Sequence, residues 1–418
     1  MAVGDVYKLR LESIVPLGDA LGRFDGKPVF VEGGAPDETV CCRVTEERKT
    51  WARAELLEII EPSPARIDST CAFYGKCGGC NLQHIDYNAQ LAAKTAILKD
   101  SFLRIGGCQP PQPEIFPSPP WEYRNRMLFH CLREKSKLKH SSQQKQAAKL
   151  KQAAKNEGDL KFGLMGKQSG EIIAVSDCPV AAAPIREILC QSGKGITLPP
   201  EKDRFTVFSI DDVLLNEGGR QKGKIKILDK EIFIDAGLFF QSNCFMLEKL
   251  AQELRKIAAL SSRNLPMADL YCGVGTFALF LGNMFPKIIL AEENKNAVSL
   301  ARENLKSAVA SEAGGAVKTS GAEFFALRDN EWPRTLLRSK DAFGFAVVDP
   351  PRAGLSPKLA AALAQDGPPL MAYVYCDAAS LARDSKILAT GGYKLNELKL
   401  FDFYPQTAHI ETLAVFER

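Results

Sequence analysis

From about residue 250 to the C-terminus, short apolar runs alternate with amphipathic segments, and this alternation restricts the fold more than any other feature. The apolar runs predict strands at 268–271, 288–291, 345–348 and 371–375. Helical spacing of apolar residues predicts helices between them, at 276–284, 296–309 and 357–364. Strands that alternate with helices form a parallel, doubly wound sheet, and ligands bind at the carboxyl ends of its strands. We therefore expect a Rossmann-like α/β domain over residues 251–418.

The rest of the chain is expected to form two further domains, because 418 residues exceed one ordinary hydrophobic core. Residues 1–62 contain short β-rich runs separated by glycine turns, a pattern typical of a small β-barrel of the oligonucleotide-binding (OB) type. Residues 63–250 combine clustered cysteines, a predicted helix at 87–106 and further β-prone runs, which indicates a central α+β domain. Within it, residues 135–158 form a basic insertion rich in Lys, Gln, Ser and Ala.

Composition and charge narrow the class of protein. No apolar run reaches the roughly 18–20 residues that cross a bilayer, and the N-terminus has no signal pattern, so we expect a cytoplasmic protein without a membrane partner. We also expect a monomer. The net charge of +4 does not by itself indicate nucleic-acid binding, but segment 135–161 carries eight lysines against two acidic residues. Such a segment either contacts a phosphate backbone or is a solvated loop.

A glycine-rich turn follows the first predicted strand of the C-terminal domain, in the run Asp-Leu-Tyr-Cys-Gly-Val-Gly-Thr at 269–276. Gly273 and Gly275 let the backbone turn sharply and approach a ligand near a helix N-terminus. Glu292 ends the second strand, where a carboxylate can accept hydrogen bonds from ribose hydroxyls. Asp349 precedes two prolines that form a rigid turn after the fourth strand. Together these features resemble the cofactor site of class I methyltransferases, and a purely structural turn is the alternative.

Two residues near the C-terminus have the chemistry of a nucleophile and a base. Cys376 ends the fifth predicted strand, before a helix predicted at 378–390, and at such an edge the pKa of a thiol can fall. Glu411 precedes the last strand and is the candidate base. Taken alone, the cysteine is also typical of a buried core, and the glutamate of a solvated surface.

Taken together, the motifs resemble those of the RNA uracil-5-methyltransferase family over nearly the whole chain. They are Phe-Gln-Ser-Asn at 240–243, the glycine turn at 269–275, Asp-Pro-Pro-Arg-Ala-Gly at 349–354, and the segments 376–384 and 403–412. The barrel resembles the TRAM domain of the ribosomal-RNA members. The resemblance implies a class I methyltransferase in which the S-adenosylmethionine site is lined by Gln241, Tyr271, Glu292 and Asp349. It also implies that Cys376 is the nucleophile and Glu411 the base.

The implied reaction requires both a thiol and an acid. Uracil C5 is too weakly nucleophilic to attack a sulfonium methyl group unaided, and a thiolate that adds to C6 turns the ring into an enolate. After methylation a base removes the C5 proton so that the cysteine can leave. The chain departs from the family's Ser-Cys-(Asn/Asp)-Pro motif, because it has Tyr375 and Ala378 at the first and last positions. We expect this departure to affect rate or substrate fit rather than the chemistry.

The twelve cysteines include a cluster, Cys71, Cys77 and Cys80, with glycines that let the chain wrap closely. In a cytosolic chain of this length, clustered cysteines indicate metal binding or catalysis rather than disulfides. A tetrahedral metal site or an iron–sulfur cluster needs a fourth ligand. The resemblance implies a [4Fe–4S] cluster with Cys178 as that ligand. Zinc bound by the three cysteines and His84 is the alternative.

The appended domains indicate a large folded RNA substrate, with a base turned out of a loop into the site. Phe239, Phe240 and Tyr404 are candidates to stack on such a base, although each is also a candidate for the core. We expect the substrate to be ribosomal RNA, of the 23S type. A transfer-RNA T-loop uridine is the alternative substrate. A third hypothesis is a non-catalytic RNA-binding assembly protein descended from such an enzyme.

Overall fold

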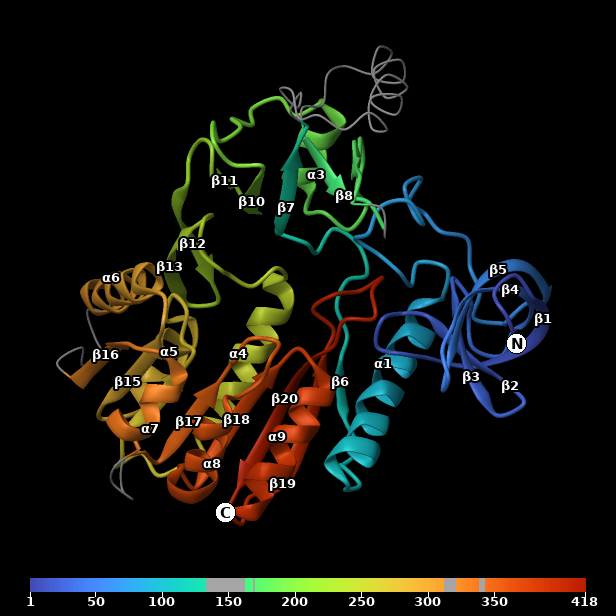
Figure 1. Cartoon of the computed structure of the whole chain (residues 1–418). Coiled ribbons are helices and arrows are strands. Elements are labelled where there is room, and N and C mark those ends of the chain that lie inside the picture. The colour runs from blue at the N-terminus through green and yellow to red at the C-terminus, as the bar shows by residue number, and fades with distance from the viewer. Residues whose placement is uncertain (133–161, 168–169, 312–320, 338–342) are drawn as a thin grey trace.

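The computed structural model describes residues 1–132, 162–167, 170–311, 321–337 and 343–418. At the N-terminus, five strands close into a barrel, as expected, in the order β1-β2-β3-β5-β4. Their alternating side chains place Leu9 and Leu11 inside the barrel. The barrel stands beside the other parts in Figure 1. Its strands are β1 (Val6–Ile14), β2 (Ala20–Phe24), β3 (Lys27–Glu32), β4 (Thr39–Glu47) and β5 (Ala52–Glu61).

The C-terminal region forms one sheet of eight strands, in the order β16-β15-β14-β17-β18-β20-β19-β6. The first five of these strands are parallel, but β20 runs antiparallel to both β18 and β19. The sheet is therefore mixed, because a short loop rather than a crossover helix joins β19 to β20. The strands are β6 (Glu114–Phe116), β14 (Met267–Leu270), β15 (Ile288–Glu292), β16 (Ala322–Ala326), β17 (Phe345–Val348), β18 (Leu370–Tyr375), β19 (Lys394–Phe401) and β20 (Glu411–Glu417).

Helices cover both faces of this sheet, as Figure 1 shows. Phe345 and Val347 of β17 pack with the core of one face, and Ala346 and Val348 with that of the other. One face is covered by α4 (Cys244–Ala258), α5 (Thr276–Leu281), η2 (Gly282–Met284) and α6 (Lys295–Ser311). The other is covered by α1 (Tyr87–Ser101) with its continuation η1 (Phe102–Gly106), η4 (Asp329–Glu331), α7 (Trp332–Thr335), α8 (Pro357–Asp366) and α9 (Ala378–Thr390). This is the expected Rossmann-like domain.

The central region has a smaller sheet with its own core, in which the rings of Phe129, Phe162 and Phe205 pack together. Its order is β11-β10-β7-β8-β9, and a two-stranded hairpin of β12 and β13 follows. The bounds are β7 (Arg126–Cys131), β8 (Phe162–Met165), β9 (Ile172–Ile173), α3 (Ala183–Cys190), β10 (Arg204–Ile210), β11 (Val213–Asn216), β12 (Lys222–Ile227) and β13 (Lys230–Asp235).

The predicted division at residues 250 and 251 falls inside α4, which is one continuous helix. In addition, β6 lies in the expected central domain by sequence but pairs with β19 of the C-terminal sheet. Sequence order therefore does not separate the central and C-terminal parts, because long-range pairing joins them. The basic insertion at 135–158 lies outside the described residues. In the described part of the chain, no helix has the length and apolar character needed to span a membrane.

Candidate functional site

The glycine turn lies at the carboxyl end of β14, between that strand and α5. Tyr271, Gly273 and Gly275 all have positive φ, of 62°, 52° and 81°. A Cβ on Gly273 would meet no atom within 4 Å, so this stretch of backbone faces open space. The amide of Gly273 donates to Glu292 Oε2 at 3.3 Å, which joins the turn to the end of β15. The turn therefore leaves main-chain groups accessible to a ligand.

Three carboxylates surround this turn, because β14, β15 and β17 end at the same edge of the sheet. They are Asp269, Glu292 and Asp349. Burial, together with the charges of Asp349 and Glu292, raises the pKa of Asp269 to about 8. Burial and the charge of Glu292 likewise raise the pKa of Asp349. Such a group of neighbouring acids, with Asp269 buried and the other two half-buried, favours a ligand that brings positive charge and hydroxyl donors.

One atom of this group has no partner among the described residues. Asp269 Oδ2 accepts the amide of Ala278 at 2.9 Å, whereas its buried Oδ1 has no hydrogen-bond partner within the described part of the chain. An unpaired buried acceptor beside an open glycine turn fits a cofactor with ammonium, sulfonium and ribose groups, as S-adenosylmethionine has. Asp269 was not predicted as a site residue, although its position before the glycine turn was the available signal.

Tyr271 belongs to the glycine turn itself, and Gln241 precedes α4. The Tyr271 hydroxyl donates to Asp329 Oδ2 at 2.7 Å, and its ring packs edge-on against Trp332. Gln241 is buried just before α4, whose first turn is capped by Asn243. Among the described residues, no hydrogen bond or ion pair joins the side chain of Gln241 or Tyr271 to the three acids. Asp329 was not predicted as a site residue, because it follows β16, an edge strand with a weak apolar pattern in the sequence.

The candidate nucleophile, Cys376, and the candidate base, Glu411, lie at the same edge of the sheet, where β18 ends and β20 begins. Tyr375 of β18 is paired with Thr412 of β20, so the residues one step beyond, Cys376 and Glu411, face each other. The Thr412 hydroxyl donates to the Tyr375 carbonyl at 3.0 Å and holds this register. Adjacent strands are about 5 Å apart, so the thiol and the carboxyl share one small space.

The electrostatics of this pair differ from expectation. Burial, followed by the charges of Glu411 and Asp349, raises the pKa of Cys376 to about 12, and Arg352 partly opposes this shift. Burial and Asp349 also raise the pKa of Glu411, again against Arg352. The strand edge was named as a place where the pKa of the thiol can fall, whereas burial and the neighbouring acids raise the pKa of Cys376 here. Arg352, the fourth residue of the Asp-Pro-Pro-Arg motif, is the nearby cation.

The two unusual residues of the nucleophile motif have structural roles. The Tyr375 side chain is fully buried beneath the sheet, and its hydroxyl donates to the Pro351 carbonyl. Ala378 is the first residue of α9, and the Asp377 side chain caps that helix by accepting the Ser380 amide at 2.8 Å. The cap orders the turn without a proline.

Of the three candidate stacking residues, Phe240 is core, Phe239 is 61% exposed beside Arg126, and Tyr404 is half-buried against His409.

The four cysteines predicted as cluster ligands line one cavity of about 450 Å³ in the central region: Cys71, Cys77, Cys80 and Cys178. The guanidinium of Arg124 lines the same cavity, and its buried Nε has no hydrogen-bond partner in the described part of the chain. In the described residues, no three Cys, His, Asp or Glu side chains are arranged to hold a metal ion. Sulfurs that surround a cubane lie farther apart than those around one ion, because the iron atoms stand between them.

His84 does not suit the alternative zinc site. Its Nε2 lies 2.9 Å from the Gly34 carbonyl, and its Nδ1 lies 2.5 Å from the Tyr74 hydroxyl. Both ring nitrogens are therefore engaged in hydrogen bonds between the barrel and the cysteine segment. A ligand role would require His84 to break one of them. The donor set of four cysteines beside a buried cation fits an anionic cluster better.

Two protein-family models match this chain, one in its C-terminal half and one at its N-terminus. A model of the tRNA (Uracil-5-)-methyltransferase family matches residues 220–418, and a TRAM domain model matches residues 2–57. An uncharacterized RNA methyltransferase of Treponema denticola is 32% identical, over 94% of this chain and 94% of the relative. The 23S rRNA (uracil(1939)-C(5))-methyltransferase RlmD of Photobacterium profundum is 27% identical, over 96% of this chain and 91% of its own length.

A solved structure has the same fold. The tRNA (uracil-54, C5)-methyltransferase of Pyrococcus abyssi, in complex with S-adenosyl-L-homocysteine, superimposes with a TM-score of 0.69. It is 22% identical, and the match covers 98% of this chain and 100% of that one. At this identity the likeness concerns the fold.

Proposed function

This chain belongs to the RNA (uracil-5-)-methyltransferase family, and we propose that it methylates C5 of a uracil in 23S ribosomal RNA, using S-adenosylmethionine. The observation that carries the proposal is the shared sheet edge, where Cys376 faces Glu411 and both lie near Asp349. Relatives named for 23S rRNA cover nearly the whole chain, barrel included, which favours ribosomal RNA. The transfer-RNA T-loop is the competing substrate.

In this proposal the Cys376 thiolate adds to C6 of the flipped uracil, and the C5–C6 electrons move into an enolate at C4. S-adenosylmethionine supplies an electrophilic methyl group on its sulfonium, and neutral S-adenosylhomocysteine remains after transfer to C5. The Glu411 carboxylate then takes the C5 proton. The C5–C6 double bond reforms as the C6–sulfur bond breaks. Cys376 departs as a thiolate, and the product is 5-methyluridine.

We assign the methyl donor to the space between the glycine turn and the three acids. Glu292 suits the ribose hydroxyls, and Asp349 suits the positively charged part of the donor. Gln241 and Tyr271 would close the sides of that space. A bound cation would lower the pKa of Cys376 and of Glu411, which is the direction that both steps require.

We assign a [4Fe–4S] cluster to Cys71, Cys77, Cys80 and Cys178. The support is the cavity that all four cysteines line and the buried guanidinium of Arg124 beside it. Such a cluster would carry negative charge next to that cation. Methyl transfer needs no electron, so the role assigned to these cysteines is to hold the segment and to position RNA.

Two variants test the proposed reaction. Replacing Glu411 with Gln should leave the C5 proton in place, so a covalent protein–RNA adduct carrying the new methyl group should accumulate on denaturing gels. Replacing Cys376 with Ala should abolish transfer from tritiated S-adenosylmethionine while leaving cofactor binding intact. Turnover by Cys376→Ala would rule out the covalent route. Supplying 23S rRNA and transfer RNA separately, and mapping the labelled nucleotide, decides between the two substrates. Inactivity on both RNAs would support the non-catalytic hypothesis.

A further inference from the structure

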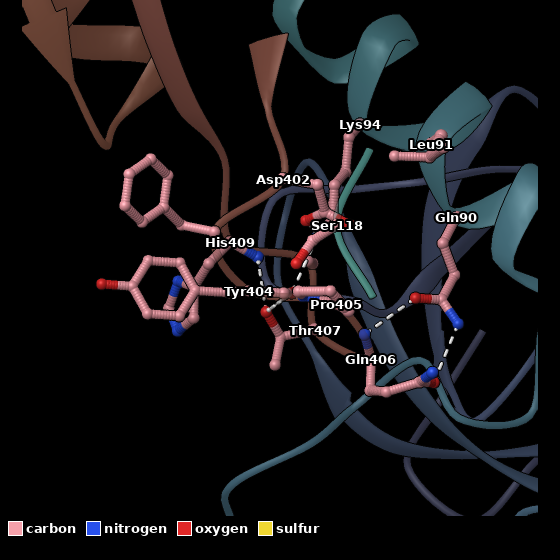
Figure 2. Close-up of polar contacts among 12 residues, drawn as sticks. Gln90, Leu91, Lys94, Ser118, Asp402, Tyr404, Pro405, Gln406, Thr407 and His409 are labelled. Carbon is pink, nitrogen blue, oxygen red and sulfur yellow. Dashed lines mark hydrogen bonds and ion pairs between the residues drawn. The ribbon is translucent and has the colours of Figure 1, made fainter. Parts of the chain in front are cut away.

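The loop from Asp402 to Ile410 carries the chain from β19 to Glu411, so its shape sets where the candidate base stands. The loop has no regular structure, and Gln406 adopts φ 67°, which is uncommon for a residue other than glycine. Such a loop keeps one conformation only where its surroundings hold it. Figure 2 shows that side chains of α1 point toward it.

Gln90 of α1 holds the strained residue. Its Oε1 accepts the amide of Gln406 at 2.9 Å, and its Nε2 donates to Gln406 Oε1 at 3.0 Å. Gln90 itself is fully buried and also donates to the carbonyls of Leu82 and Ile85. The amide side chain of Gln90 therefore ties the loop to α1, as Figure 2 shows for Gln406, and α1 to the segment before it.

Lys94, one helical turn further along α1, holds the first part of the loop. Its ammonium group lies 2.5 Å from Asp402 Oδ1 and donates to the Tyr404 carbonyl at 2.9 Å. Both charged side chains are completely buried. A buried pair of this kind contributes little net stability compared with apolar packing, and its best attested use is to specify one arrangement.

Asn81, the residue after Cys80, holds the second half of the loop. Its Oδ1 accepts the amide of Ala408 at 2.9 Å, while its Nδ2 donates to the Leu17 carbonyl of the barrel at 2.7 Å. The main-chain amide of Asn81 also donates to the Gln406 carbonyl at 3.1 Å. A Cβ at position 18 would collide with the Asn81 side chain, so Gly18 permits this approach.

We propose that Asn81, Gln90 and Lys94 are positioning residues for Glu411, which together hold the loop from Asp402 to Ile410 in the conformation that presents the base. The cysteine segment and the barrel thus act on proton removal through Asn81. This inference rests on the proposed function, because it concerns the second chemical step of that reaction. It gives the cysteine segment a role within the catalytic domain in addition to RNA binding.

The removal of the C5 proton can be measured separately from the earlier steps of the reaction. In RNA whose uridines are replaced by 5-fluorouridine, addition and methylation proceed. C5 then carries fluorine in place of the hydrogen that the base would remove as a proton, so the covalent adduct is trapped. The rate of trapping therefore reports the steps before Glu411 acts, whereas turnover on ordinary RNA includes proton removal. A displaced base slows turnover and leaves trapping unchanged.

The variants are Lys94→Met and Asn81→Ala, tested on transcribed 23S rRNA with and without 5-fluorouridine. Matched controls are Lys99→Met on the same helix and Asn88→Ala, whose side chains lie away from the loop. Turnover should fall by about 10- to 100-fold, as expected for a displaced catalytic group, with trapping and cofactor binding within about twofold of the original protein. Both controls should behave like the original protein.

Lys94→Met leaves Asp402 buried without its cation, which can lower the stability of the variant. This effect on folding must be separated from the effect on the position of Glu411. The pair Lys94→Met with Asp402→Asn removes both charges and should recover the melting temperature, but not turnover, because the bond to the Tyr404 carbonyl stays lost. Equal losses of trapping and turnover, or unchanged turnover in Asn81→Ala, would overturn the positioning role. If the original protein traps no fluorinated RNA, the proposed function itself fails, and the positioning role fails with it.

Discussion

The hydroxyl of Tyr375 donates a hydrogen bond to the Pro351 carbonyl at 3.2 Å, which ties the strand that leads to the candidate nucleophile, Cys376, to the turn that follows Asp349. Tyr373, two residues earlier on the same face, donates to Asp384 of α9 at 2.7 Å. Both tyrosines are fully buried, so this face of β18 supports the site from below. The bulky residue beside Cys376 is therefore part of the buried core on this face of the sheet.

Replacing Tyr375 with Phe should cost about 1 kcal/mol of unfolding free energy, because the part-buried hydrogen bond to the Pro351 carbonyl is lost. Catalytic efficiency should stay within about threefold, since the ring still fills its site. Replacing Tyr375 with Ala should cost about 3–5 kcal/mol through the cavity left behind. Denaturant unfolding and kcat/KM measure the two effects. A tenfold fall in kcat for Tyr375→Phe at unchanged stability would place the hydroxyl in the chemistry.

The reactivity of Cys376 should depend steeply on pH in the ligand-free protein. Its pKa is raised to about 12, so the reactive thiolate is scarce at neutral pH and increases about tenfold per pH unit. Alkylation by iodoacetamide, followed at this residue by mass spectrometry, should therefore still be rising at pH 9. Replacing Glu411 with Gln removes a negative neighbour and should shift the curve to lower pH. A plateau below pH 9 would contradict the raised pKa.

Replacing Asp349 with Asn should stabilise the ligand-free protein and weaken cofactor binding. The folded-state pKa of Asp349 is raised by burial and by Glu292, so the folded state holds its proton more tightly than the unfolded state. Stability is therefore present below the ordinary carboxyl pKa and is lost as pH rises through the raised value. The variant escapes this loss, and its melting temperature at pH 8 should rise by about 2–4 °C.

The control for that variant is Asp366→Asn, at the end of α8 and away from the cofactor turn. Melting temperatures at pH 5 and pH 8, with and without S-adenosylmethionine, provide the measurement. The gain should shrink at pH 5, and the cofactor should stabilise the variant less than the original protein. A variant that binds the cofactor equally well would remove Asp349 from the binding site.

The cysteine-lined cavity predicts the metal content of the protein. Protein purified without oxygen should be brown and contain iron and sulfide in equal amounts. Cys178→Ser should lose most of this iron, whereas Cys190→Ser, at the exposed end of α3, should keep it. His84→Ala should also keep it, because both ring nitrogens already bond to protein groups. A colourless protein with stoichiometric zinc would refute the cluster.

The parts of this fold that depend on local sequence were predicted closely. The helix over Ala378–Thr390 and the strand over Phe345–Val348 have the expected bounds, because apolar periodicity and a capping Asp377 act within a few residues. The edge strand β16 was missed, since its partly exposed side chains give a weak apolar pattern. The pKa of Cys376 was misjudged, since its acidic neighbours come from β17 and β20.

By itself, the sequence determined the barrel, the parallel half of the sheet, the glycine turn and the chemical identity of the residues at the strand ends. These follow from periodicity and turn residues, which act over short distances along the chain. Only the tertiary structure decided that β20 enters the sheet antiparallel beside β18 and brings Glu411 to Cys376. It also decided that α1 and Asn81 contact the loop that leads to Glu411, the candidate base. The contacts that α1 and Asn81 make with this loop join residues about 300 positions apart, and no local pattern in the sequence encodes them.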